Sequence, residues 1–224
     1  MARRAYATED KEARRRAILT AAAELFSRSK ELPSVAEVAA AAGLAKGTVY
    51  LYFRTKGAIF AAILLEGWGV VVDQLGTAFR SSADSQADKV AAFLDGFVGY
   101  VNDNPVLLQL DAIVQGLLER DLDLDERAAF KEALHSRIDG GGAIVDEALG
   151  LAPGRGVQLL VRSHALTRGL WAYFDTPGAD AAFGLSDFAK DLAQALTEYW
   201  RGALASAERV DTLHSPPAEL DPKR

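Results

Sequence analysis

The chain has 224 residues, no cysteine and a formal net charge of −6. Half of its residues are hydrophobic, which is enough for a sizeable core and excludes a mainly disordered chain. The absence of cysteine excludes disulfides, Fe–S clusters, thiolate zinc sites and a cysteine nucleophile. The three histidines do not have the spacing of metal ligands, so the sequence predicts neither a metal site nor a cofactor.

Charge is distributed unevenly along the chain. Residues 1–56 contain 11 Lys or Arg and 6 acids, a net charge of +5, whereas the rest of the chain carries −11. This asymmetry favours an N-terminal end that binds a polyanion, although a solvated helix face would give the same count. The N-terminus lacks the apolar region of a secretion signal, and no apolar stretch approaches the ~18 residues of a membrane span. We therefore expect a soluble, cytoplasmic protein with no membrane contact.

The apolar residues recur with helical spacing and strand signals are nearly absent, which predicts an all-α fold of about nine helices. Thr8 is expected to cap a first helix that reaches about residue 27. Arg3 and Arg4 before it fit either a minor-groove arm or a disordered tail. Ser34, followed by an acid at Glu37, predicts a capping box at the start of the second helix.

The second helix should end at Gly43, a residue type that favours the position after a helix C-cap. A short helix is expected over residues 45–53, and Thr55 is expected to cap a long helix that reaches about residue 79. Further helices are expected over residues 86–102, 105–119, 125–148, 155–174 and 186–205.

A run of glycines in the second half of the chain predicts a weak point in one helix. The run Gly140–Gly142 should weaken or break the 125–148 helix, because each glycine costs ~1 kcal/mol relative to alanine. The predicted domains are a helix-turn-helix head over residues 1–54, a second domain over residues 55–206, and a flexible tail over residues 207–224.

Residues 33–56 form the most informative segment, because two short helices joined by a glycine-containing turn make a helix-turn-helix. On a helical wheel, Lys46, Gly47, Tyr50 and Leu51 share the face turned away from the core, with Thr48 at its edge. Gly47 allows the backbone to approach another surface closely. The polar side chains of this face can donate hydrogen bonds to phosphates or base edges.

The run SVAEVAAAAGLAKGTVYLYFRTKGAIF resembles the DNA-binding signature of the TetR family of transcriptional regulators, and the match covers about residues 12–65. Its most specific part is KGTVYxYFxxK, from residue 46 to residue 56. The resemblance implies a homodimer in which helices 1–3 bind double-stranded operator DNA. It further implies that the C-terminal helices bind a small-molecule effector and dimerise. Together with Gly47, the expected DNA-binding residues are Ser34, Lys46, Thr48, Tyr50 and Lys56.

Three residues depart from the family pattern. Ala45 replaces the usual Ser or Thr cap, which removes a cap worth ~1 kcal/mol. Leu51 stands where His is common, and Gly57 stands where Glu is common. These departures put the base preference in doubt but leave the helix-turn-helix assignment intact.

The body of the chain is expected to hold an effector pocket and a dimer interface. A pocket needs an apolar lining with a few polar groups. The pocket candidates are Trp68, Phe93, Phe97, Tyr100, Asp111, His164, Arg168 and Trp171, although each alone fits an ordinary core or interface position better. The helices over 155–174 and 186–205 have stripes that fit a four-helix dimer interface. Its candidate residues are Leu160, Leu170, Phe188, Leu192, Leu196 and Tyr199.

An enzyme is disfavoured, because the chain contains no nucleophile elbow, phosphate loop or dinucleotide-binding glycine pattern. Asp121 and Asp123 are interpreted as solvated residues of a charged linker. The sequence therefore predicts a ligand-responsive DNA-binding regulator, by family analogy a repressor that a small, partly apolar molecule releases from its operator. The alternative is a helical small-molecule-binding protein with a degenerate DNA-binding head, which the departures at Leu51 and Gly57 keep open.

The charge distribution leads to a measurable expectation. If the basic head contacts phosphates, the logarithm of DNA affinity should fall steeply with the logarithm of salt concentration, despite the acidic net charge. Titrations of operator DNA at several salt concentrations would measure the slope. A nearly flat dependence would contradict phosphate contact by the head.

Overall fold

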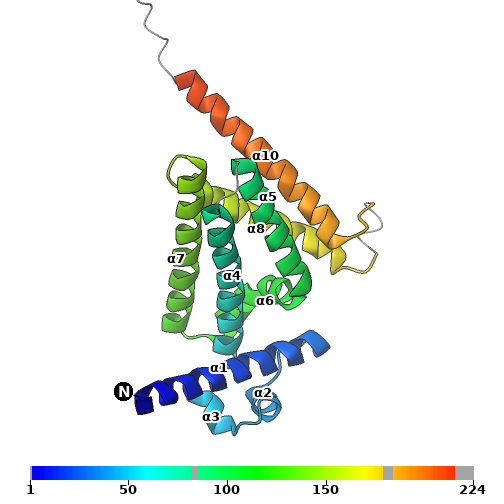
Figure 1. Ribbon diagram of the computed structural model, residues 1–224. Coiled ribbons are helices and arrows are strands. Elements are labelled where there is room, and N and C mark those ends of the chain that lie inside the picture. The colour runs from blue at the N-terminus through cyan, green and yellow to red at the C-terminus, as the bar shows by residue number, and fades with distance from the viewer. Residues whose placement is uncertain (1, 82–84, 179–183, 215–224) are drawn as a thin grey trace, which may run out of the picture. The chain divides into compact units, whose positions relative to one another are not determined.

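The computed structural model describes residues 2–81, 85–178 and 184–214, and these residues form nine α-helices and no strand. The predicted all-α fold is thereby confirmed. In chain order (Figure 1) the helices are α1 Ala2–Ser29, α2 Val35–Ala41, α3 Lys46–Tyr50, α4 Lys56–Arg80, α5 Gln86–Asp103, α6 Pro105–Asp121, α7 Leu124–Leu149, α8 Arg155–Phe174 and α10 Phe188–His214.

The chain forms two compact units. Unit 1 comprises Met1–Thr77 and Gly99–Gly140, and unit 2 comprises Ala78–Val98 and Gly141–Arg224. Unit 1 therefore combines the predicted head, residues 1–54, with parts of α4, α5 and α7 and with all of α6. The compact units and the predicted domains thus divide the chain differently, because the head has its own packing partners further along the chain.

In unit 1, α1 lies across the N-terminal end of α4 (Figure 1), and α2 packs against α1 and α3. The rings of Phe26 and Phe60 join α1 to α4 with centroids 6.0 Å apart. The expectation that no apolar stretch approaches the length of a membrane span was wrong for α4, which by length and composition could span one, a property that core helices of soluble proteins share. Ile59, Phe60 and Leu64 of α4 are at most 1% exposed, so they belong to the protein core.

Both ends of the helical chain differ from expectation. Helix α1 begins at Ala2, so Thr8 lies inside it rather than capping it, and Arg3 and Arg4 belong to a helix rather than to a free arm. The alanines and arginines of residues 2–5 favour this helical extension. Helix α10 continues to His214, nine residues beyond the expected end. The expected flexibility of residues 215–224 falls outside the described residues.

The glycine run Gly140–Gly142 does not break α7, contrary to the sequence-based expectation. A Cβ atom at Gly142 would lie 2.4 Å from Cγ2 of Val157 and 2.6 Å from the backbone nitrogen of the same residue. A Cβ atom at Gly156 would lie 2.2 Å from the carbonyl oxygen of Gly142. The absence of side chains lets the backbones of α7 and α8 nearly touch. Packing at this crossing offsets the low helix propensity of the glycines.

A side chain of α7 also caps α8. The N-cap residue Gly154 has a φ of +84° and no side chain with which to cap the helix. Instead, the carboxylate of Asp146 accepts hydrogen bonds from the backbone N–H groups of Gly154 and Gly156 at 2.7 and 2.5 Å. A carboxylate at a helix N-terminus is favoured by the helix dipole. The cap therefore fixes the turn between α7 and α8.

The core of unit 2 centres on Trp200 of α10, a fully buried residue that lies outside the predicted stripe. Its ring packs on Phe79 and Phe93 at 6.3 and 5.9 Å, and its indole N–H donates to the hydroxyl of Ser163 at 2.9 Å. The inner face of α8 combines a single large residue with three small ones, all of them buried: Leu159, Gly156, Ser163 and Thr167.

The glycine run provides a matched pair of substitutions. Gly142→Ala should destabilise the protein by about 1–3 kcal/mol, because its Cβ would collide with the backbone of α8. Gly140→Ala should stabilise it by about 0.5–1 kcal/mol, since nothing lies within 4 Å of that Cβ and alanine favours the helix. Urea unfolding of both variants measures the difference, and equal effects would contradict the close crossing.

Candidate nucleic-acid interface

The turn between α2 and α3 is built from local signals in the sequence. The predicted capping box is present: the backbone N–H of Ser34 donates to the carboxylate of Glu37 at 2.8 Å, and the N–H of Glu37 donates to the Ser34 hydroxyl at 3.3 Å. These backbone and hydroxyl contacts of Ser34 lower the pKa of Glu37. They keep the carboxylate ionised at the start of α2, where the helix dipole favours a negative charge.

Gly43 ends α2 as predicted. Its φ of +67° is in the left-handed region, and its N–H donates to the carbonyl of Ala40 at 3.2 Å. The N–H of Leu44 donates to the carbonyl of Ala39 at 2.9 Å, which completes a Schellman motif. This motif sets the direction in which the chain enters α3.

Helix α3 presents the expected outer face. Val49 is fully buried, whereas Lys46, Gly47 and Tyr50 are exposed and Thr48 is half-buried. The ammonium of Lys46 lies 5.9 Å from the centroid of the Tyr50 ring, close enough for a cation–π contact. This face therefore offers a cation, an aromatic hydroxyl and a stretch of bare backbone within a single helical turn.

Two of the departures from the family pattern, Ala45 and Leu51, lie at the two ends of α3. Ala45 is the N-cap of α3, with the extended backbone of a cap (φ −70°, ψ 143°) but no side-chain hydrogen bond. Leu51 follows α3 and is 82% exposed. It is the most exposed large hydrophobic side chain among the described residues, so it is available to an external surface.

The third departure, Gly57, lies in the first turn of α4. Thr55 caps this helix as predicted, because its hydroxyl accepts the N–H of Ala58 at 3.1 Å. A Cβ atom at the buried Gly57 would lie 2.3 Å from Cδ1 of Leu122 and 2.8 Å from Cβ of Asp121. Glycine is thus required for the connection between α6 and α7 to lie against this turn.

Asp121 and Asp123 lie at the connection between α6 and α7 as expected, and Asp123 is exposed, but both also lie close to cations of the first helices. Lys56 Nζ lies 3.8 Å from a carboxylate oxygen of Asp121, and Arg54 Nη1 lies 3.6 Å from one of Asp123. The sequence carries no signal for either pair, since about 65 residues separate the partners. Arg54, which the sequence-based site did not include, therefore belongs with Lys56 at the boundary of the head.

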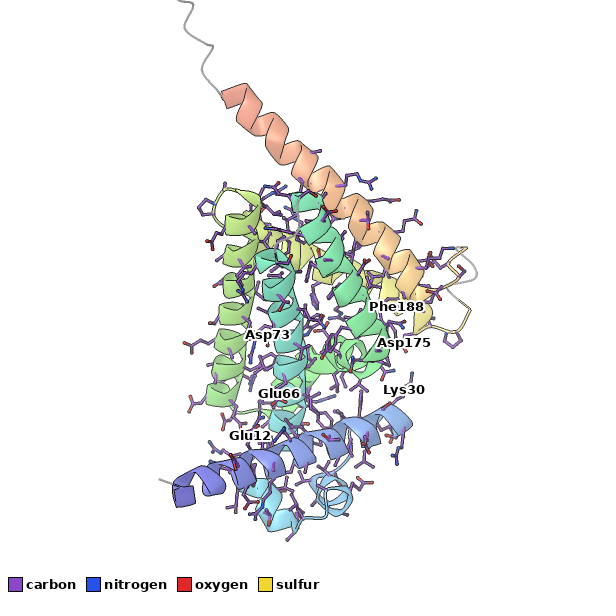
Figure 2. All side chains as sticks on the ribbon, viewed as in Figure 1. Glu12, Lys30, Glu66, Asp73, Asp175 and Phe188 are labelled. Carbon is purple, nitrogen blue, oxygen red and sulfur yellow. The ribbon has the colours of Figure 1, made fainter. Side chains whose placement is uncertain are left out.

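A second set of charges joins α1 to α4. Arg15 forms an ion pair with Glu66 and lies 3.7 Å from Glu12, and Figure 2 shows Glu66 on α4 beside Glu12 on α1. The Arg15 guanidinium also lies 5.7 Å from the centroid of the Phe53 ring. One side chain thus contacts α1, the end of the helix-turn-helix and α4. It contributes to the packing of the head against α4.

The predicted effector residues fall in both compact units. Trp68, Tyr100 and Asp111 belong to unit 1, where Asp111 is buried and burial raises the pKa of the half-buried Tyr100. Phe93 and Phe97 are buried in unit 2 with ring centroids 6.0 Å apart. The remaining three candidates are half-buried residues of α8 in unit 2: His164, Arg168 and Trp171.

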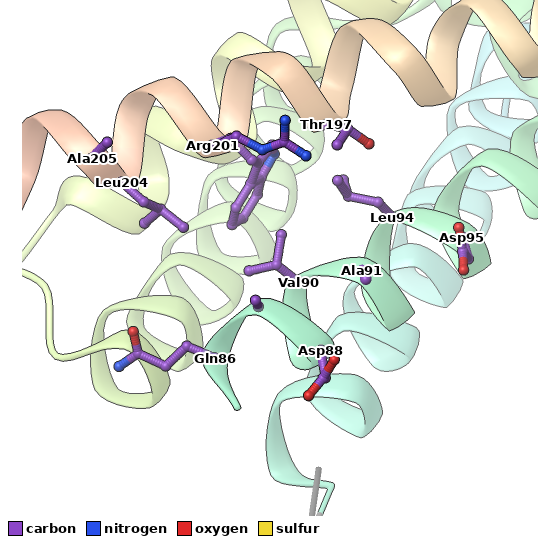
Figure 3. Close-up of a pocket in the computed structure, with 12 residues that line it drawn as sticks. Gln86, Asp88, Val90, Ala91, Leu94, Asp95, Thr197, Arg201, Leu204 and Ala205 are labelled. Atoms are coloured by element: carbon purple, nitrogen blue, oxygen red, sulfur yellow. The ribbon is translucent and has the colours of Figure 1, made fainter. Parts of the chain in front are cut away.

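The structure also has a surface groove that the sequence did not predict. It has a volume of about 560 Å³ and lies between α5 and α10 in unit 2 (Figure 3). Its lining combines apolar residues such as Val90 and Leu94 with charged ones such as Asp95 and Arg201. None of the predicted effector residues lines this groove. Sequence reasoning missed it because its two walls come from helices about 100 residues apart.

The predicted dimer residues separate into two groups. Phe188, Leu192 and Leu196 are at most 8% exposed within their own subunit, so they stabilise the core of unit 2 rather than offering a surface. The partly exposed residues are Leu160, Leu170 and Tyr199, to which the structure adds Val161 and Tyr173, 47% and 43% exposed. A helical wheel alone does not indicate whether a stripe faces its own subunit or a partner.

Two protein-family models match the chain, one in its N-terminal part and one in the remainder. Residues 18–63 match the model of the bacterial regulatory proteins of the tetR family. Residues 65–207 match the model of the tetracyclin repressor-like C-terminal domain. A comparison with curated protein sequences gives no match.

Several solved structures have a similar fold. A TetR transcriptional regulator from Rhodococcus sp. RHA1 has a TM-score of 0.54 and 22% identity, and the match covers 88% of this chain and 97% of that one. FadR from Bacillus subtilis, solved with stearoyl-CoA, has a TM-score of 0.55 and 22% identity, and the match covers 81% of this chain and 95% of FadR. SmeT, the repressor of a multidrug efflux pump of Stenotrophomonas maltophilia, has a TM-score of 0.54 and 20% identity, and the match covers 86% of this chain and 89% of SmeT.

The uncapped start of α3 can be tested directly. Ala45→Ser should stabilise the protein by about 0.5–1 kcal/mol, because residue 45 already has cap geometry and a serine oxygen would accept an orphan N–H of α3. Thermal or urea unfolding measures the gain. Ala36→Ser, at an exposed position inside α2, is the control and should bring no gain.

Proposed function

This chain belongs to the TetR family of bacterial transcriptional regulators, and we propose that it is a homodimeric repressor that leaves its operator DNA when a small molecule binds. Regulators of this family bind operator DNA and small-molecule effectors, act as dimers and are not enzymes. The observation that carries the proposal for this chain is the exposed face of α3, with Lys46, Gly47 and Tyr50, on a helix held by the buried Val49.

In this proposal α3 enters the major groove of DNA. Lys46 and Thr48 donate to phosphates or base edges, and Tyr50 donates through its hydroxyl. Gly47 keeps the backbone of α3 close to the DNA, and the open space around it supports this role. Leu51 adds an exposed apolar side chain that could contact a thymine methyl group.

Phosphate contacts would position the head on the duplex. Lys56 lies in the first turn of α4, where its ammonium and the free N–H groups of the helix start can meet a phosphate. Ser34 can also contribute: its N–H is occupied by Glu37, but a hydroxyl that accepts one hydrogen bond can still donate its own proton.

Dimerisation would place two heads on successive major grooves, about 34 Å apart on B-DNA. The partly exposed apolar residues of α8 and α10, with Val161 and Tyr173 on the outer face of α8, support an interface there. Two buried donors without a partner in the described chain, Trp171 Nε1 and the Tyr199 hydroxyl, also lie on these helices. A second subunit could supply their acceptors.

The effector would act through α4, which starts directly after the head, in unit 1, and ends in unit 2. A molecule that binds one position of α4 more tightly than another shifts the population of head positions and lowers operator affinity. Five of the eight candidate pocket residues are aromatic, and a regulator of similar fold was solved with stearoyl-CoA. Both support an effector that is at least partly apolar.

A gel shift with the DNA upstream of the protein's own gene tests the DNA-binding role. The double variant Lys46→Ala, Tyr50→Ala should lose saturable binding by tenfold or more, because two contacts are removed from each of two heads. Lys131→Ala, an exposed lysine of α7, is the control and should bind as the unmodified protein does. Absence of sequence-preferring binding by the unmodified protein would favour a helical ligand-binding protein instead.

A further inference from the structure

The connection between α6 and α7 places two carboxylates on the basic boundary of the head. This segment, residues 121–123, is called the acidic loop below. Asp121 pairs with Lys56 and Asp123 pairs with Arg54, at 3.8 and 3.6 Å. The partners flank the capping residue of α4, so both ion pairs lie where the proposed head would meet the DNA backbone.

Burial and hydrogen bonds hold the acidic loop in its position. Leu122 is only 5% exposed, and its carbonyl accepts the Arg127 Nε–H at 3.2 Å. Asp123 caps α7 reciprocally with Glu126, with bonds of 2.8 and 3.3 Å. Leu122 and Asp123 are therefore fixed in place.

Gly57 makes this position possible. A Cβ atom there would collide with Leu122 and with Asp121, including the backbone carbonyl carbon of Asp121 at 3.2 Å. A glutamate, which the family pattern often has at this position, would both displace the acidic loop and repel its carboxylates. The glycine and the docked acidic loop therefore belong together in this chain.

We propose that the acidic loop is an autoinhibitory element whose carboxylates compete with DNA phosphates for Lys56 and Arg54. The proposal rests on the proposed function and assigns a regulatory contact to the same head. Operator binding requires each cation to leave a carboxylate for a phosphate, so the acidic loop lowers the affinity of the unliganded repressor. Loop position, which α6 and α7 control, then sets how strongly the head holds DNA.

The size of the effect follows from the exposure of the pairs. The side chains are 35% and 29% exposed in the Lys56–Asp121 pair and 77% and 46% in the Arg54–Asp123 pair, so solvent screens both. Exposed ion pairs of this kind change an equilibrium by about 1.4- to fivefold each. Because solvent screening places these pairs near the lower end of that range, at about 1.8-fold each, the four pairs of a dimer should together change operator affinity by about tenfold.

The first experiment removes the competing charges. The variant Asp121→Asn, Asp123→Asn should bind the upstream DNA about tenfold more tightly at low salt, measured by fluorescence anisotropy, with a gain that shrinks as salt screens the charges. Asparagine preserves the N-cap of α7, so the fold is retained. Asp125→Asn is the matched control, because Asp125 is exposed, lies two residues further on and forms no ion pair with the described residues.

A double-mutant cycle separates competition from a general loss of negative charge. Asp121→Asn should gain nothing in a Lys56→Gln background, and Asp123→Asn should gain nothing in an Arg54→Gln background. Gly57→Ala should raise operator affinity in the same direction by displacing the acidic loop, and its gain should not add to that of Asp121→Asn. Melting curves check that each variant is folded.

The outcomes distinguish this inference from the proposed function. If the unmodified protein shows no sequence-preferring DNA binding, the proposed function fails and the acidic loop has no operator affinity to regulate. If it binds the operator but the asparagine variants bind no better than it does, or no better than Asp125→Asn, only the autoinhibitory role is overturned. An equal gain with and without Lys56 and Arg54 would also overturn it.

Discussion

The close approach of residues 121–123 to the first turn of α4 joins the end of the head to the later helices of unit 1. It requires a glycine at position 57, pairs the two cations at the end of the helix-turn-helix, and brings α6 to the point where the head ends. Since α4 is also a core helix, its first turn is the place where the stability of unit 1 and the proposed binding of DNA involve the same residues.

The turns and caps of the helix-turn-helix are built from short-range interactions. The capping box of Ser34 and Glu37, the left-handed Gly43 and the cap at Thr55 each join residues no more than five positions apart. Interactions at such spacing depend on local backbone geometry, so they can be read from residue type and order. The outer face of α3 then follows from the burial of Val49, because a helix with one side buried exposes the other.

Unit 2 depends on different physics. Gly142 and Gly156 disfavour helix locally, yet both lie in continuous helices, because the close crossing of α7 and α8 needs them. Trp200 completes a buried cluster with Phe79 and Phe93, three residues from three different helices. In both cases the decisive partner is distant in sequence, and tertiary packing overrides local propensity.

Sequence alone was sufficient for the all-α fold, the helix-turn-helix, its caps and the exposed face of α3, because each depends on neighbours within one or two helical turns. It was insufficient wherever a residue's role depends on a distant partner. Tertiary structure decided that Phe188, Leu192 and Leu196 face their own core, that the glycine run lies in a continuous helix, and that Asp121 and Asp123 pair with the head. A helical wheel indicates that a face is apolar or charged, but only the packed chain determines what lies against it.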